Sequence, residues 1–265
     1  MRAADVVEHF LSRAEWVDRA KTVDRVIAGD PAVDVERCVV TWMPSYDALR
    51  AALARDVRLV VCHEPTFWNH RDETPDDDVQ IQTKLAFIRD NELTVVRNHD
   101  AWDRWPEIGI PWAWARHLGL GPVPVDASGV MGYQHRYDIE PVSLGAFARR
   151  VAAACAALGE GAVQVSGDLE TRVGRIGVGT GCACLIDAFQ KMGCDCSIVC
   201  DDGTCYWRDI ERAKEQGHPV IRVNHGTSEE PGMVTLARYI NENVDGLSAE
   251  HLPHGSVFRL VGTVS

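Results

Sequence analysis

His225 and Glu229 are the two residues of this chain whose types and spacing point most directly to chemistry. They stand four apart in the segment Val-Asn-His-Gly-Thr-Ser-Glu, after an apolar run and before a segment with helical periodicity. Side chains at positions i and i+4 on the first turn of a helix share one face, so both can bind one metal ion. The competing interpretation is that Glu229 only completes a capping box.

Two further groups of histidines and carboxylates each follow an apolar, strand-like run. These groups are His63-Glu64 after residues 58–62, and His99-Asp100 with Asp103 after residues 93–97. Taken singly, such a group is commonly an ordinary turn. Three strand ends that each supply a histidine and a carboxylate instead predict one metal site, because ligands in α/β folds collect at the carboxyl ends of strands.

The mixture of imidazole and carboxylate ligands favours zinc, manganese, iron or cobalt over calcium or magnesium. Six candidate ligands predict a pair of ions with bridging carboxylates rather than a single ion. Two ions about 3.5–4 Å apart activate water and polarise a carbonyl or phosphoryl group, which is the chemistry of hydrolysis. The alternative is an α/β domain without metal.

The chain alternates strand, loop and helix in a way that predicts an α/β fold. The first elements expected are a helix at 6–11, a strand at 37–42, a helix at 46–54, a strand at 58–62, a helix at 79–91 and a strand at 93–97. Pro65 prevents the strand before it from continuing. This alternation implies a largely parallel sheet, covered by helices on both faces.

Residues 119–128, which are rich in proline and small turn formers, mark a junction between two lobes, 1–125 and 126–265. Ser143 is the expected N-cap of a helix that runs to about residue 158. The later elements expected are strands at 163–166 and 175–178, a helix at 182–192, a strand at 195–200, a helix at 207–216, a strand at 220–223, a helix at 233–243 and a closing strand at 256–264. In an alternative arrangement, the closing strand returns to the first lobe.

Composition and charge argue against several classes of function. The chain has 265 residues and a formal net charge of −12 with no basic stretch, which does not suit a nucleic-acid binder. No apolar stretch approaches the roughly 18–20 residues that span a bilayer, and acids interrupt the N-terminal segment where a signal peptide is apolar. Nine cysteines, an odd number, fit reduced thiols. We expect a cytoplasmic protein that binds neither nucleic acid nor membrane.

Two clusters are open to two interpretations each. The turn Gly177-Val178-Gly179-Thr180-Gly181 has the setting of a phosphate-binding loop but no following lysine, and close backbone packing explains it equally well.

Six cysteines lie in the segment from Cys182 to Cys205. They could form a thiolate metal or iron–sulfur site. Small buried apolar side chains explain them more simply, because C-x-C pairs are not the C-x-x-C knuckle of zinc sites.

The motifs and their order resemble those of the NIF3-like (DUF34) proteins. Three segments carry most of the resemblance: Cys62-His63-Glu64-Pro65-x-Phe67, His99-Asp100-Ala101-Trp102-Asp103 and His225-Gly226-Thr227-Ser228-Glu229. They are similar to that family's His-His-Pro-x-x-Phe, His-Thr-x-x-Asp and Gly-His-x-x-Ser/Thr-Glu signatures. Residues 132–144 and 175–195 are similar to further family segments, so the resemblance covers nearly the whole chain.

The resemblance implies a NIF3-like fold of two α/β lobes and two divalent transition-metal ions, with zinc, iron or manganese as candidates. It also implies a toroidal homohexamer with the metal pairs facing an internal cavity. Residue by residue, it places His63, Asp103, His225 and Glu229 at ligand positions. Glu64 stands where the family has a second histidine. It could coordinate as a further ligand, or its presence could leave one metal weakly held.

Three hypotheses about function follow from the resemblance and the metal chemistry. Members of the family are often labelled GTP cyclohydrolase type 2 homologues. The first hypothesis is a metal-dependent hydrolase that acts on an amide, cyclic amide or related C–N bond of a small molecule, with Glu64 or His99 as proton shuttle. The second is a metal chaperone or insertase that uses the cysteines as transfer ligands. The third is a scaffold or regulatory protein whose metal is structural.

Overall fold

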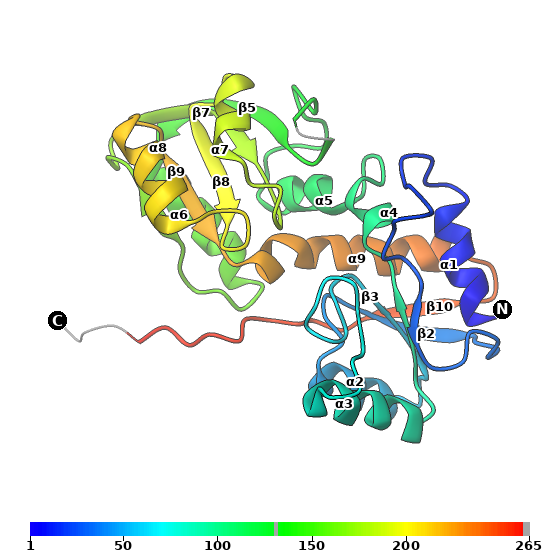
Figure 1. Ribbon diagram of the computed structural model, residues 1–265. Coiled ribbons are helices and arrows are strands. Elements are labelled where there is room, and N and C mark those ends of the chain that lie inside the picture. The colour runs from blue at the N-terminus through cyan, green and yellow to red at the C-terminus, as the bar shows by residue number, and fades with distance from the viewer. Residues whose placement is uncertain (130–131, 262–265) are drawn as a thin grey trace. The chain divides into compact units, whose positions relative to one another are not determined.

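The computed structural model describes residues 1–129 and 132–261, which form two mixed five-stranded sheets flanked by helices (Figure 1). The predicted α/β class is confirmed. Contacts within the chain divide it into two compact units. The first unit comprises Met1–Trp105 and Met233–His254, and the second comprises Pro106–Gly232 and the residues from Gly255 onward.

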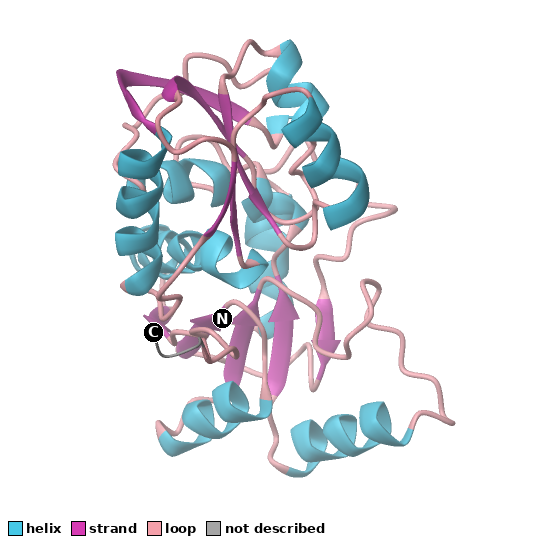
Figure 2. Cartoon of the chain, turned by 90° about the vertical axis from the view of Figure 1, so that its left-hand side faces the viewer, coloured by secondary structure: helices cyan, strands magenta, loops and turns pink. Residues whose placement is uncertain are grey.

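The sheet of the first unit has the strand order β1-β4-β3-β2-β10, in which only β1 is antiparallel to its neighbour. Helices α2 and α3 lie against one face of this sheet (Figures 1 and 2). The elements are α1 Ala3–Leu11, β1 Val26–Ala28, β2 Arg37–Thr41, α2 Tyr46–Ala54, β3 Leu59–Cys62, α3 Val79–Asp90, β4 Thr94–Arg97, α4 Asp100–Asp103 and β10 Ser248–His251.

The central strands of this sheet form because their residues are apolar on both faces. Every residue of β3 and β4 is buried, as expected for a parallel sheet that is covered on both sides. Ser45 begins α2 by accepting a hydrogen bond from the amide of Ala48, and Asp78 begins α3 in the same way. These caps mark where the chain enters α2 after β2 and where it enters α3 after the loop that follows β3.

The sheet of the second unit has the order β5-β7-β8-β9-β6, with antiparallel pairing at both edges. As predicted, Ser143 caps α6 and accepts a hydrogen bond from the amide of Ala146. The elements are α5 Ile110–His117, β5 His135–Ser143, α6 Leu144–Ala156, β6 Gln164–Ser166, β7 Arg172–Val178, α7 Ile186–Lys191, β8 Cys196–Cys200, the π-helix η2 Tyr206–Ile210, α8 Glu211–Glu215 and β9 Val220–Val223.

Helix α9, His225–Asn243, begins in the second unit and ends in the first. The amphipathic pattern at 233–243 marks only the second half of this helix, whereas the spacing of His225 and Glu229 correctly places both on its first turn. The helix continues through Pro231. Within the described ranges, no helix is both long and apolar enough to cross a membrane.

The division of the chain differs from the sequence prediction at two places. Residues 106–125, which were expected in the first lobe, belong to the second unit. The strand that returns to the first sheet is β10, not the closing strand predicted at 256–264. Residues 256–261 form no strand, and the rest of that prediction lies outside the described residues. β10 lacks apolar alternation, which explains why the sequence did not reveal it.

Candidate metal centre

Two neighbouring strands of the first unit end at the residues that the sequence analysis selected. β3 is followed directly by His63 and Glu64, and β4 is followed by His99 and α4. The two strands are parallel, and Cys62 lies opposite Arg97 in their register. Their carboxyl ends are therefore adjacent, at the edge of the sheet where ligands of α/β folds collect.

His63, His99 and Asp103 form a group whose donor atoms lie within 4.8 Å of one another, close enough to bind one metal ion. His63 Nε2 lies 3.3 Å from Asp103 Oδ1, and the rings of His63 and His99 stack with their centroids 4.5 Å apart. His63 Nδ1 lies 3.3 Å from the carbonyl oxygen of Asn98, which can only accept a hydrogen bond. With Nδ1 as the donor, Nε2 directs its lone pair towards Asp103, as in metal-binding histidines.

His99 has carboxylates at both of its ring nitrogens. Nδ1 lies 2.9 Å from Asp100 Oδ1 and 3.3 Å from Asp103 Oδ2, and Nε2 lies 3.7 Å from Glu64 Oε1. Burial disfavours the charged ring, but the negative charges of Asp103, Asp100 and Glu64 outweigh burial and raise the pKa of His99 to about 10. His99 therefore holds its proton between acidic groups.

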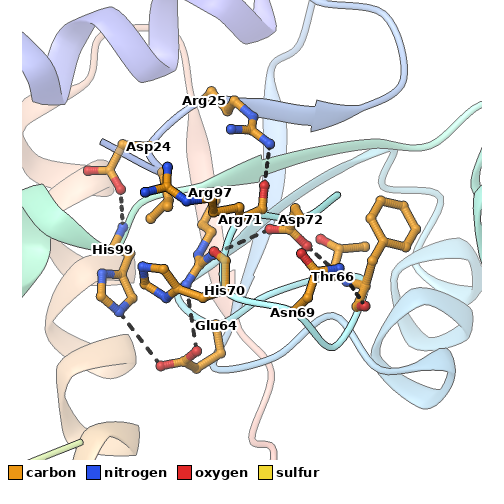
Figure 3. Close-up of polar contacts among 12 residues, drawn as sticks. Asp24, Arg25, Glu64, Thr66, Asn69, His70, Arg71, Asp72, Arg97 and His99 are labelled. Atoms are coloured by element: carbon orange, nitrogen blue, oxygen red, sulfur yellow. Dashed lines mark hydrogen bonds and ion pairs between the residues drawn. The ribbon is translucent and has the colours of Figure 1, made fainter. Parts of the chain in front are cut away.

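Asp24 is a residue of this site that the sequence analysis missed. Its buried carboxylate accepts hydrogen bonds from the backbone amides of His99, Asp100 and Ala101 at 2.6, 3.0 and 2.8 Å. Figure 3 shows the bond to His99. Burial raises the pKa of Asp24, and the amide hydrogen bonds oppose this rise. Asp24 thereby fixes the short helix α4, which carries Asp103.

Arg97, the last residue of β4, is fully buried beside Glu64 and was also missed (Figure 3). Its Nη2 lies 3.6 Å from Glu64 Oε2, while Nε and Nη1 donate to the carbonyl oxygens of His63 and His70. The His70 ring meets the His99 ring edge to face, with centroids 5.7 Å apart. The sequence shows only that a charged residue ends an otherwise apolar strand; the partners of Arg97 are visible in the fold alone.

In the second unit, His225 and Glu229 lie together on the first turn of α9. His225 Nε2 lies 3.0 Å from Glu229 Oε2. The amide of His225 donates to Asp201 Oδ1 at 2.6 Å, and its Nδ1 lies 3.7 Å from Asp202 Oδ2. Two strand ends therefore position this pair. β9 leads into His225, and Asp201, which follows β8, supplies the carboxylate that accepts a hydrogen bond from the first amide of the helix.

The glycine-rich turn after β7 packs against this pair of ligands. A Cβ at Gly181 would lie 2.8 Å from Glu229 Oε1 and 3.0 Å from His225 Nε2, and Gly181 has a φ of +52°. A Cβ at Gly177 would lie 2.6 Å from the ring of Phe189. Close packing therefore accounts for these glycines, and Gly181 in particular leaves room for the imidazole and the carboxylate.

Several cysteines of the second unit are part of its apolar core. Cys184 and Cys200 are buried with their sulfurs 3.6 Å apart, and Cys200 Sγ donates to the carbonyl oxygen of Gly181 at 2.8 Å. Cys194 and Cys196 belong to the same core. Within the described part of the chain, no group with metal-ligand spacing includes a cysteine. These four cysteines agree with the interpretation as small buried apolar side chains, whereas Cys182 is exposed and Cys205 is half-buried.

The donor set of the first unit fits a divalent transition metal. Imidazole nitrogens and a carboxylate oxygen from His63, His99 and Asp103 are ligands that zinc, iron and manganese accept. His63 Nε2 and Asp103 Oδ1 face each other as two electron-pair donors, and a cation between them would remove this repulsion. The first unit alone therefore offers a candidate site for one metal ion.

Three solved structures share this fold over almost their full lengths. The protein ybgI, described as of unknown function, is 20% identical, with a TM-score of 0.76 over 97% of this chain and 100% of its own. Staphylococcus aureus protein SA1388 is 15% identical, with a TM-score of 0.77 over 98% and 99%. A Bacillus cereus protein related to NIF3 is 12% identical, with a TM-score of 0.72 over 100% and 99%.

The family profile gives the same result from the sequence. No match was found among curated proteins. Residues 1–253 match the profile described as Duf34/NIF3 (NGG1p interacting factor 3). Because this profile covers nearly the entire chain, the protein belongs to the Duf34/NIF3 family.

Proposed function

We propose that this protein is a metal-dependent hydrolase that acts on an amide or cyclic amide C–N bond of a small molecule. The observation that carries this proposal is the group of His63, His99 and Asp103 at the carboxyl ends of β3 and β4, with donor atoms within 4.8 Å of one another. Bound divalent ions lower the pKa of water and polarise a carbonyl group, which is the chemistry that hydrolysis of such a bond requires.

Each unit supplies one pair of proposed ligands. His63 and Asp103 come from the first unit, and His225 and Glu229 come from the second. Each pair brings an imidazole nitrogen and a carboxylate oxygen within 3.3 and 3.0 Å, respectively. We expect these four residues to serve as ligands of two ions of zinc, iron or manganese. Family membership supports this expectation, since all four residues lie in the segments that resemble the family signatures.

Glu64 and His99 are the residues proposed to move protons. His99 Nε2 lies 3.7 Å from Glu64 Oε1, and its Nδ1 contacts Asp100 and Asp103. The Glu64 carboxylate can take a proton from the attacking water, and the protonated ring of His99 can donate one to the leaving nitrogen. Because His99 is held by acids on both sides, its ring is fixed in orientation for this transfer.

The experiment that tests the proposal combines metal analysis with turnover. Elemental analysis of the purified protein should find divalent transition metal, and a panel of small cyclic amides should reveal metal-dependent hydrolysis. We expect Asp103→Asn to lower metal affinity by at least about 100-fold, because it removes a charged ligand while preserving shape. The control is Asp47→Asn on α2, where the carboxylate is 97% exposed and turnover should be unchanged.

A second candidate function is a metal chaperone or insertase. The observation that favours it is the thiol pair Cys184 and Cys200, which contacts the turn that packs against His225 and Glu229. Thiolates bind soft transition metals and could accept an ion during transfer. A chaperone would deliver its ion to an apo-acceptor without hydrolysing any substrate. If removal of the metal affected only assembly, the protein would instead be a metal-stabilised scaffold.

A further inference from the structure

The strongest unexplained feature of the site is the buried guanidinium of Arg97 (Figure 3). Three of its contacts fix it in place. Nε donates to the carbonyl oxygen of His63 at 2.9 Å, Nη1 donates to that of His70 at 2.6 Å, and Nη1 also lies 3.4 Å from Asp72 Oδ2. An arginine held by so many partners keeps its charge and its position.

The fourth contact of Arg97 reaches the candidate metal centre. Nη2 lies 3.6 Å from Glu64 Oε2, and the other oxygen of Glu64 lies 3.7 Å from His99 Nε2. Both oxygens of Glu64 therefore face positively charged or hydrogen-donating groups. Asp103 differs, because its Oδ1 faces His63 Nε2, the nitrogen assigned a lone pair above. Only Oδ1 of Asp103 differs in this way, since its Oδ2 lies 3.3 Å from His99 Nδ1. Glu64 also lies within ligand distance of His63, so the two carboxylates are distinguished by the charge of Arg97 beside Glu64.

A second acid, Asp72, also pairs with Arg97. The side chain of Asp72 is fully buried, with Oδ2 3.4 Å from Arg97 Nη1, and its Oδ1 accepts a hydrogen bond from the amide of Phe67 at 2.8 Å, which holds the loop after β3. The guanidinium is consequently a fixed positive charge that lies between a structural acid and Glu64. A fixed positive charge beside a carboxylate weakens the binding of a metal cation to that carboxylate.

We infer that Arg97 is a positioning residue that keeps Glu64 out of the metal coordination sphere, so that the two ions are bound unequally. One ion is held tightly, with His63 and Asp103 among its ligands, and the ion position nearest Glu64 is weak. Glu64 then remains available as a proton acceptor. This inference rests on the proposed function, because it concerns the same metal centre.

Titration calorimetry of the purified, metal-depleted protein with zinc and with manganese tests the inference. The wild type should bind one ion at least about tenfold more tightly than the second. Glu64→Gln should leave the tight affinity within about threefold of wild type. Arg97→Met should strengthen the weak affinity by roughly tenfold, and the double variant with Glu64→Gln should lose that gain.

Two further measurements keep the test decisive if Arg97→Met does not fold, since that change leaves Asp72 buried without its cation. Glu64→His, whose neutral ring is not attracted to Arg97, should also strengthen the weak site. Asp103→Asn, in contrast, should lose the tight ion. Loss of the tight ion in Glu64→Gln, or two equally tight ions in the wild type, would overturn the inference. Failure of wild type to bind either metal would instead refute the proposed function.

Discussion

At the scale of single residues, one glycine allows the chain to approach His225 and Glu229 closely. Gly181 has a left-handed backbone, and a Cβ at this position would lie 2.8 Å from an oxygen of Glu229 and 3.0 Å from a nitrogen of His225. Only glycine avoids both the cost of the left-handed backbone and this collision, because it has no Cβ. The placement of these two proposed ligands therefore depends on the absence of a side chain at Gly181.

We predict that Gly181→Ala weakens metal binding by about tenfold or more, because the new methyl group displaces His225 and Glu229. The left-handed backbone should add a stability loss of about 1 kcal/mol. The matched control is Gly217→Ala, which has a φ of +66° but no atom within 4 Å of the added Cβ. It should show a similar stability loss in thermal melts with unchanged calorimetric metal affinity. Equal metal affinities in the two variants would contradict the prediction.

At the scale of elements, a short helix of the site depends on an acid from a distant segment. α4 has four residues, and its first amides donate to the carboxylate of Asp24, which precedes β1. Such a helix is too short to be stable by itself. The orientation of His99 and Asp103 is consequently set by packing and by this one carboxylate.

We predict that Asp24→Ala destabilises the protein by about 2–3 kcal/mol, because it leaves three buried amides without their acceptor. It should also weaken metal binding, since α4 carries Asp103. Asp78→Ala is the control, because Asp78 caps α3 through the amides of Gln80 and Ile81, and neither bond involves a residue of the candidate site. Denaturant unfolding should show a loss of about 1 kcal/mol for Asp78→Ala, with metal affinity unchanged.

The elements that could be predicted from the sequence are those with apolar periodicity. β3, α2 and β9 appear where their patterns placed them, within one residue at each end. The edge strands β5 and β10 were missed because each carries several polar residues and has no covered second face. The first half of α9 was indicated only by the spacing of His225 and Glu229, because its residues lack apolar periodicity. Pro231 lies inside this helix, where a proline removes only one backbone hydrogen bond.

The candidate site could also be predicted only in part, because some of its residues are marked by local sequence features and others only by contacts with distant segments. The histidines and acids that follow β3 and β4 can be recognised in the sequence, since a strand end and a ligand type are local features. Asp24 and Arg97 cannot be assigned in this way. Asp24 acts on amides 75 and more residues later, and the partner of Arg97 at the site is 33 residues earlier, so only the fold reveals these contacts.

At the scale of the whole molecule, we predict a homohexamer, as the family resemblance implies. Size-exclusion chromatography with light scattering should give a mass near six times the 29.3 kDa of the chain. Asp103→Asn should retain this mass, because it alters a ligand and not a surface between subunits. A monomer in the wild type would contradict the expected assembly, and dissociation caused only by removal of the metal would favour the scaffold function.

The pairing of β10 with β2 has a consequence for biosynthesis. Ser248 lies opposite Arg37, so the first sheet is complete only when residues more than 200 positions apart in the chain have paired. Most of the second unit lies between these two strands in the sequence, and it can fold on the ribosome before β10 has been made and has paired with β2. Because pairings of such high contact order form slowly, we expect an N-terminal half that needs protection from aggregation until translation ends.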